Sequence, residues 1–213
     1  MESFCASDGV DDSDTDEPGG SAGSTLWPSK LLLFGGEVVS PESGDRMCTN
    51  DCLIYDTEYN VWYEAQTSGQ KPTSRAGHAM ARVDNHLYVF GGCRRSSFLN
   101  DLFVLNTDTM TWSKSSSDST QCPKGRAYHT LTADSRSKSL FLFGGNDDQN
   151  SFSELQVFNI AQQQWWCPNT SGATPSARIG ASSLFVHPDG GGEGGGRMVS
   201  TPRPKDLIER SFN

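Results

Sequence analysis

Three arginines recur in one short motif and could hold a negatively charged ligand. The motif reads Arg75-Ala76-Gly77-His78, then Arg126-Ala127-Tyr128-His129, then Arg178-Ile179-Gly180-Ala181. A guanidinium group presents a planar fork of donors that matches a carboxylate or a phosphate. If the fold gathers the three arginines on one rim, they could grip a carboxylate, a phosphate or an acidic peptide. The alternative is that each arginine pairs with an acid or a carbonyl of the neighbouring structural element and supports the fold.

The histidines and cysteines give weaker indications of chemistry. His78 and His129 occupy equivalent positions in the motif, and the third copy has Ala181 there. A catalytic base is not normally repeated in this way, so we expect both histidines to support the fold. The cysteines are scattered without a Cys-x-x-Cys pair, so we predict free thiols and neither a metal site nor a cofactor; they are Cys5, Cys48, Cys52, Cys93, Cys122 and Cys167.

A glycine-rich segment has the spacing of a dinucleotide-binding fingerprint, at Gly190, Gly192 and Gly195. It is followed by a strand fragment and Pro202, whereas phosphate binding needs the N-terminus of a helix at that point. We therefore predict a flexible hairpin loop instead of a nucleotide site.

The net charge of −9 is concentrated near the N-terminus. Residues 1–24 contain seven acidic and no basic residues, which leaves −2 for residues 25–213. We predict that this acidic, Gly/Ser-rich lead is a disordered tail. The lack of clustered Lys and Arg argues against a nucleic-acid partner. With no secretory leader and no apolar run near the roughly 20 residues of a membrane helix, the sequence predicts a cytoplasmic or nuclear protein that is not secreted and does not contact a membrane.

An internal repeat places these residues on regular elements. A hydrophobic run ending in Phe-Gly-Gly occurs at 31–36, 87–92 and 140–145. Each is followed by an acid that opens a second apolar run, by a tryptophan 11 positions after the acid, and then by the arginine motif; the acids are Asp51, Asp101 and Glu154, and the tryptophans are Trp62, Trp112 and Trp165. Apolar runs recurring at intervals of 56 and 53 residues fit four-stranded sheets repeated around an axis.

The recurring diglycine, acid, tryptophan and Arg-x-x-His resemble the kelch family over residues 31–199. The resemblance implies an all-β fold, a kelch-type β-propeller built from four-stranded blades. We expect three strands from the first repeat, four each from the second and third, and from the fourth only Ser182–Val186 and the fragment Arg197–Val199. That makes about three and a quarter blades, fewer than the four to eight with which propellers close. We assign the repeated residues to the fold, the glycines for close backbone approach and the tryptophans for filling the space between blades; they are Gly35, Gly36, Gly91, Gly92, Gly144, Gly145, Trp62, Trp112, Trp165, His78 and His129.

The domain organisation follows from the repeat. We predict an acidic tail over 1–24, kelch repeats over 25–199 and an atypical tail over 200–213. Neither end of the array has a polar cap, so we expect exposed apolar residues on the open blade faces, including Leu33, Ile54, Leu184 and Phe185. An aggregation-prone fragment, assembly with other blades, and a two-chain ring of about six blades are the alternatives.

These observations favour a non-catalytic protein-interaction module or scaffold with a protein or peptide partner, and an acidic partner would suit the arginines. The loops Glu37–Asn50 and Cys93–Asn100, the second carrying Arg94 and Arg95, are alternative contact surfaces. Two other functions stay open. The chain could belong to a kelch-fold enzyme of the oxidase, epimerase or specifier type, or it could be a truncated product without independent activity.

Overall fold

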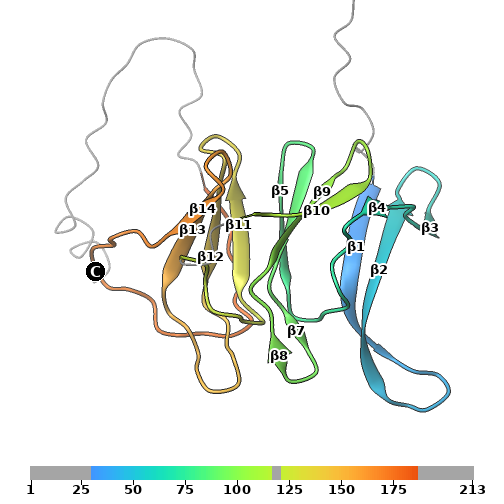
Figure 1. The fold of residues 1–213 in the computed structure, drawn as a ribbon, viewed down its shortest axis with the longest axis horizontal. Coiled ribbons are helices and arrows are strands. Elements are labelled where there is room, and N and C mark those ends of the chain that lie inside the picture. Colours follow the sequence, from blue (N-terminus) through green and yellow to red (C-terminus); the bar gives the residue numbers. More distant parts are fainter. Residues whose placement is uncertain (1–29, 117–120, 187–213) are drawn as a thin grey trace, which may run out of the picture.

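The computed structural model describes residues 30–116 and 121–186. These residues form strands, turns and loops without a helix, as the sequence predicts, and therefore include no helix that could span a membrane. Three sheets stand side by side in chain order (Figure 1). The predicted acidic tail, the glycine-rich loop, Arg197–Val199 and the predicted C-terminal tail lie outside the described residues.

The first sheet has the order β1-β2-β3. Its strands β1 (Lys30–Val39), β2 (Arg46–Asp56) and β3 (Val61–Glu64) pair antiparallel. The register between β1 and β2 shifts between Phe34 and Gly36, where Gly35 and Gly36 both have positive φ. Beyond this shift the two strands continue as a long hairpin that extends past the body of the sheet (Figure 1).

The second sheet has the order β4-β10-β9-β6-β5. Four of its strands, β5 (Ala79–Val83), β6 (His86–Phe90), β9 (Leu102–Asn106) and β10 (Thr111–Lys114), pair antiparallel in succession. The fifth, β4 (Ser68–Gly69), pairs parallel with β10 and comes from the segment that leaves the first sheet. This addition ties the two sheets together through the backbone.

The third sheet has the order β11-β12-β13-β14 and is antiparallel throughout. Its strands are β11 (Thr130–Asp134), β12 (Ser139–Phe143), β13 (Leu155–Asn159) and β14 (Gln164–Trp166). A separate two-stranded ribbon, β7 (Cys93–Arg94) with β8 (Ser97–Phe98), follows the second Phe-Gly-Gly. The predicted count of three, four and four strands is confirmed, with β4 as an addition.

The hydrophobic core lies between neighbouring sheets. One cluster joins the first and second sheets, for example Phe34 and Ile54 with Trp112. A second cluster joins the second and third sheets, for example Phe90 with Trp165. Ile54 is only 4% exposed, so the expectation that it lies on an open face is wrong, because its side chain points toward the second sheet.

The fourth repeat differs from its prediction. Residues 182–186 form no strand within the described chain, although the same positions after Arg75 and Arg126 form β5 and β11. A strand needs a neighbouring edge for its backbone hydrogen bonds, and no described strand pairs with this segment. It lies against the third sheet, where Ser183 Oγ contacts Thr132 Oγ1 and the Phe185 ring lies 5.2 Å from that of Phe141.

Candidate functional site

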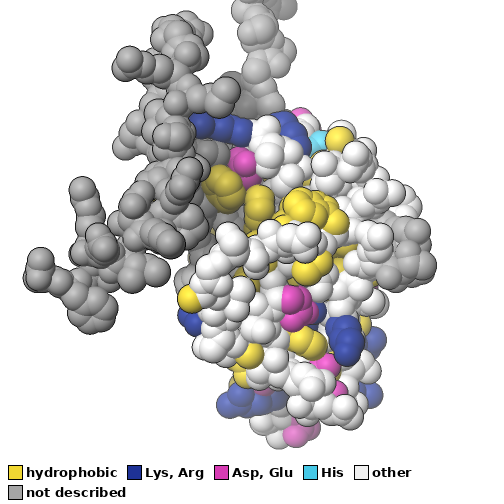
Figure 2. Space-filling view, turned by 90° about the vertical axis from the view of Figure 1, so that its left-hand side faces the viewer, with side chains coloured by type: hydrophobic (Ala, Val, Ile, Leu, Met, Phe, Trp, Pro, Cys, Tyr) yellow, Lys and Arg dark blue, Asp and Glu magenta, His cyan; other side chains and the backbone are white. Residues whose placement is uncertain are grey.

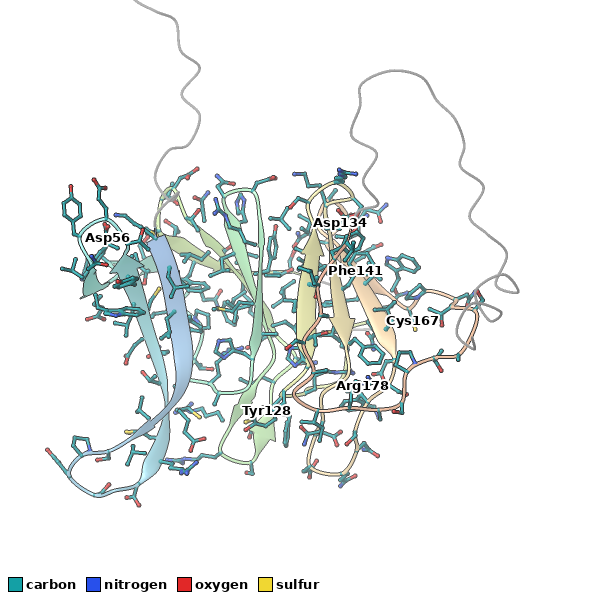
Figure 3. The ribbon with its side chains drawn as sticks, turned by 180° about the vertical axis from the view of Figure 1, so that it is seen from behind. Asp56, Tyr128, Asp134, Phe141, Cys167 and Arg178 are labelled. Carbon is teal, nitrogen blue, oxygen red and sulfur yellow. The ribbon has the colours of Figure 1, made fainter. Side chains whose placement is uncertain are left out.

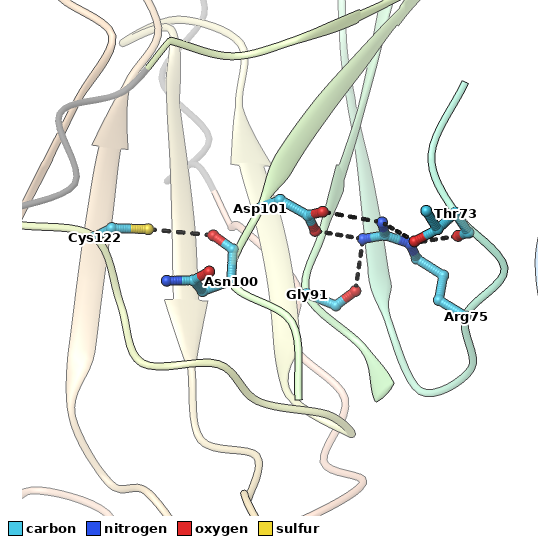
Figure 4. A network of polar contacts seen from close by, with 6 residues as sticks. All are labelled: Thr73, Arg75, Gly91, Asn100, Asp101 and Cys122. Atoms are coloured by element: carbon cyan, nitrogen blue, oxygen red, sulfur yellow. Dashed lines mark hydrogen bonds and ion pairs between the residues drawn. The ribbon is translucent and has the colours of Figure 1, made fainter. Parts of the chain in front are cut away.

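Arg75 lies at the junction between the first and second sheets, and its side chain has no exposed surface. Its Nη1 lies 2.6 Å from Asp101 Oδ1, and its Nη2 lies 3.2 Å from Asp101 Oδ2 (Figure 4). Nη1 also donates to the Gly91 carbonyl at 3.0 Å, and Nε donates to the Thr73 carbonyl at 3.0 Å. All three nitrogens of the Arg75 guanidinium group therefore have acceptors within the fold.

Arg126 repeats this arrangement between the second and third sheets. Its Nη2 lies 2.6 Å from Glu154 Oε1, its Nη1 donates to the Gly144 carbonyl at 3.1 Å, and its guanidinium carbon lies 4.0 Å from the centre of the Phe152 ring. Burial opposes ionisation of Glu154, but the hydrogen bond and charge of Arg126 prevail and lower the pKa of that carboxyl. The pair is thus ionised and held in place.

The three arginines stand at successive junctions instead of gathering as free groups on one rim. Arg75 and Arg126 are completely buried, whereas Arg178 is exposed and donates to the Ser176 carbonyl from Nε at 3.0 Å. The expectation that Arg75 and Arg126 offer their forks to a ligand is therefore corrected, because a carboxylate of the next sheet and backbone carbonyls already accept their hydrogen bonds. The alternative interpretation was that each arginine pairs with an acid or a carbonyl of the neighbouring element. It is correct for Arg75 and Arg126.

The diglycines lie where backbones from adjacent sheets approach. A Cβ added at Gly91 would lie 2.8 Å from the Arg126 carbonyl oxygen, and one added at Gly145 would lie 2.6 Å from that of Ala127. Both glycines also have positive φ. Only glycine meets both conditions without a backbone shift, so the motif is a packing requirement of the junction.

The tryptophans and histidines fill the same junctions. The Trp112 ring lies 5.0 Å from that of Phe34 in the preceding sheet, and Trp165 stands in the same relation to Phe90; both tryptophans are 1% exposed. Trp62, in the first sheet, is 53% exposed.

His78 and His129 pack edge-on against the same two phenylalanines, Phe34 and Phe90. Burial, followed by the charge of the nearby motif arginine, lowers the pKa of His78 to about 4 and that of His129 to about 3. Both are therefore neutral near pH 7, and their position favours packing over acid–base work.

The edge that carries the long hairpin and the β7–β8 ribbon differs from the junctions between sheets, because it has a hollow between two loops. Tyr128 and Arg178 lie toward this edge, whereas Asp56 and Asp134 lie toward the opposite one (Figure 3). A hollow of about 440 Å³ opens between the hairpin and the ribbon, and residues from both loops and from the Arg75 turn line it; they are Glu37, Asp45, Arg46, Met47, Cys48, Ser74, Ala76, Cys93, Arg94 and Arg95. We call this the loop hollow.

The loop hollow brings together the two loops that the sequence offered as alternative surfaces. Arg94 and Arg95 are exposed, and within the described residues neither has a carboxylate as an ion-pair partner. Arg95 has a φ of 54°, a conformation imposed by the tight turn between β7 and β8. Arg46, on β2, has its Nη1 3.3 Å from Oε1 of Glu37 on the paired strand β1 of the same hairpin, and its side chain is 79% exposed. The predicted contact loop Glu37–Asn50 contains Arg46, but the sequence did not single this residue out, because it belongs to no repeated motif.

The described residues contain no group of three or more His, Cys, Asp or Glu side chains suited to a metal ion. Of the described cysteines, Cys48, Cys52, Cys93, Cys122 and Cys167 are free thiols.

Comparison with known families agrees with the repeat. Residues 16–200 match the family described as the KLHDC2/KLHL20/DRC7 Kelch-repeats domain. The chain belongs to the kelch-repeat family. It is similar to Kelch domain-containing protein 1 of Mus musculus, with 41% identity over 66% of this chain and 39% of the mouse protein. It is also similar to Kelch domain-containing protein 2 of Bos taurus, with 35% identity over 66% of this chain and 38% of the bovine protein.

A relative named for an enzymatic reaction also matches this kelch chain. N-(sulfonatooxy)prop-2-enimidothioate sulfolyase of Thlaspi arvense is 30% identical over 70% of the chain and 43% of the plant protein. The chain thus spans about two fifths of the length of these relatives.

Proposed function

We propose that this kelch chain is a non-catalytic protein-interaction module that binds an acidic segment of a partner protein at the loop hollow. The observation that carries the proposal is the pair Arg94 and Arg95, which face solvent beside a hollow and have no carboxylate partner within the described residues. The repeat arginines Arg75 and Arg126 use their donors inside the fold, whereas Arg94 and Arg95 keep theirs available. Exposed arginine forks recognise carboxylates by paired hydrogen bonds.

Two further features support a peptide or protein ligand at this place. The hollow lies between two loops that extend from rigid sheets, an arrangement typical of binding surfaces. Its acidic residues, Glu37 and Asp45, are on the hairpin, while Arg94 and Arg95 are on the ribbon. This asymmetry would orient a bound segment, with its carboxylates toward the ribbon.

The test uses charge reversal with a matched control. The full chain and its Arg94→Glu/Arg95→Glu variant serve as baits for crosslinked capture, and recovered proteins are quantified by mass spectrometry. The control is Lys138→Glu, because Lys138 is an exposed cation that pairs with Asp84, away from the loop hollow. We expect partners to be lost at least about tenfold in the arginine variant and retained in the control. Equal recovery by the folded arginine variant would refute the proposed site.

An enzyme role is the second candidate, favoured by similarity to the sulfolyase. The purified chain would be incubated with N-(sulfonatooxy)prop-2-enimidothioate, and products would be followed by mass spectrometry. Turnover above the spontaneous background would replace the non-catalytic proposal with this one.

A further inference from the structure

The β7–β8 ribbon carries two serines directly after its two arginines. Its tip reads Arg94-Arg95-Ser96-Ser97-Phe98, and it contains the one pair of adjacent arginines in this sequence. Basic residues two and three positions before a serine, with an apolar residue after it, form a charge pattern that basophilic serine/threonine kinases accept. Ser97 meets this pattern, with the arginine pair before it and Phe98 after it.

The place of Ser97 in the fold makes its hydroxyl accessible. Ser97 is exposed, and the ribbon projects at the same edge of the molecule as the long hairpin (Figure 1). The ribbon has only two residue pairs, Cys93 with Phe98 and Arg94 with Ser97, and among the described residues β8 pairs with no strand besides β7. A segment held by so few backbone pairs opens locally at small cost. The ribbon therefore suits the extended conformation in which kinases bind their substrates.

Ser139 shows that the sequence pattern alone would not suffice. It follows Arg136 by three positions but has Ser137 in place of the second arginine, and it is 8% exposed on β12, between β11 and β13. Its Oγ donates to the Ser137 carbonyl at 3.1 Å. At the third-sheet end of the molecule, Figure 2 shows Lys and Arg toward the margins of a face whose middle is hydrophobic. The arginine pair and an accessible serine coincide at Ser97.

A phosphate on Ser97 would lie beside Arg94. The two residues are directly opposite each other in the ribbon, and opposed residues of an antiparallel pair have Cβ atoms about 4.5–5.5 Å apart on one face. A phosphoserine carries about −1.5 to −2 charges near pH 7 and three acceptor oxygens, which match the guanidinium fork. Within the described residues Arg94 has no carboxylate as an ion-pair partner. The phosphate would also add negative charge to a hollow that already contains Glu37 and Asp45.

We propose that Ser97 is a phosphorylation site for a basophilic serine/threonine kinase, and that its phosphate pairs with Arg94 and withdraws this arginine from acidic partners. The kinase transfers the γ-phosphoryl group of ATP to Ser97 Oγ. The bond between the γ-phosphorus and the β–γ bridging oxygen breaks, a bond from Oγ to phosphorus forms, the hydroxyl proton passes to the base of the kinase, and ADP leaves. The modification does not depend on the proposed function, whereas the release of an acidic segment rests on it.

Phosphorylation of the full chain locates the site. The chain and its variants are incubated with Mg-ATP and the catalytic subunit of cyclic-AMP-dependent protein kinase, and the phosphate is located by peptide fragmentation in a mass spectrometer. We expect one phosphate, on Ser97, that Ser97→Ala abolishes and Ser96→Ala retains. Arg94→Ala/Arg95→Ala should slow its addition about tenfold or more, and Arg136→Ala should not. Absence of phosphate from the folded chain, or phosphate on Ser96 or Ser139 instead, would overturn the proposal.

Phosphorus NMR reports the pairing with Arg94. A guanidinium beside a phosphate favours its dianion and lowers its second pKa. In a pH titration, the phosphorylated chain should therefore show a transition shifted to lower pH than phosphorylated Arg94→Ala, which is prepared with excess kinase. Coincident titration curves would mean that the phosphate does not pair with Arg94.

Binding of a fluorescent poly-glutamate peptide at low salt, followed by anisotropy, separates the release from the proposed function. The phosphorylated chain should bind about tenfold more weakly than the unmodified chain, and Lys138→Glu should bind like the wild type. Equal affinity of the wild type and Arg94→Glu/Arg95→Glu would refute the acidic-partner site and the release, and leave Ser97 as a kinase site. Loss of affinity in that variant without loss on phosphorylation would overturn the release and leave the proposed function standing.

Discussion

Arg75 and Arg126 lie at the junctions between sheets without exposed side-chain surface, whereas Arg94 and Arg95 lie beside the loop hollow and face solvent. The first pair recurs at a fixed place in the repeat, and each member meets a carboxylate of the next sheet. The second pair belongs to one loop only. At the two internal junctions the recurring arginines support the fold, and the unrepeated arginines are the better candidates for recognition.

The same contrast applies to aromatic residues. Trp165 and Trp166 are neighbours on β14, but Trp165 is 1% exposed and Trp166 is 50% exposed. Their side chains point to opposite faces of the strand, one into the junction and one away from it. At the internal junctions, position in the repeat, and not residue type, decides which tryptophan is buried.

Truncating these two tryptophans gives the largest expected difference. Trp165→Ala removes the contacts with Phe90 and Phe158 and should lower the free energy of unfolding by about 4 kcal/mol. Trp166→Ala should cost less than about 1 kcal/mol, since much of its ring already faces water. Urea unfolding followed by circular dichroism measures both. Similar losses of stability for the two variants would contradict the conclusion that the recurring tryptophan, and not its neighbour, holds the junction together.

Removal of a junction arginine should have the next largest effect. Arg126→Ala leaves Glu154 and the Gly144 carbonyl without their donor, and it should destabilise the fold by about 3 kcal/mol. Arg94→Ala should change stability by no more than about 0.5 kcal/mol, because Arg94 is exposed. The comparison uses thermal or urea unfolding of both variants under one condition. If Arg126→Ala unfolded at the same midpoint as the wild type, the pair of Arg126 with Glu154 would contribute nothing to stability.

The repeat explains why much of the fold could be predicted. Phe-Gly-Gly, acid and tryptophan recur at constant spacing, so the number and order of strands in three sheets followed from counting. The burial of Arg75 did not follow, because its partner Asp101 is 26 positions away and spacing alone does not show that the two side chains meet. The prediction of a strand over residues 182–186 was wrong, since strand formation depends on a neighbouring edge and not on local sequence alone.

The candidate site was harder to predict than the sheets. Arg94 and Arg95 stood out as a pair of charges in a loop, but Arg46 is on a hairpin from a different sheet. The hollow between them exists only because two sheets stand side by side. No pattern within either loop shows that the two loops lie close together in the folded chain.

The buried histidines make the junctions sensitive to acid. Burial and the charge of Arg126 lower the pKa of His129 to about 3, while an unfolded chain has the ordinary value of 6.5. Between these values the unfolded state binds more protons, so His129 opposes unfolding fully above pH 6.5 and loses this effect as the pH falls. From pH 7 to pH 5 the loss from His129 should be about 2 kcal/mol.

Substitution of this histidine isolates its contribution from those of other titrating groups. The third repeat has Ala181 at the equivalent position, so His129→Ala is the replacement that the repeat itself provides. Urea unfolding of both proteins at pH 7, 6 and 5 should show the variant losing about 2 kcal/mol less than the wild type over this range. Parallel pH profiles would mean that His129 takes up its proton equally well in the folded and unfolded chains, and that the junction is wetter around this ring than its burial indicates.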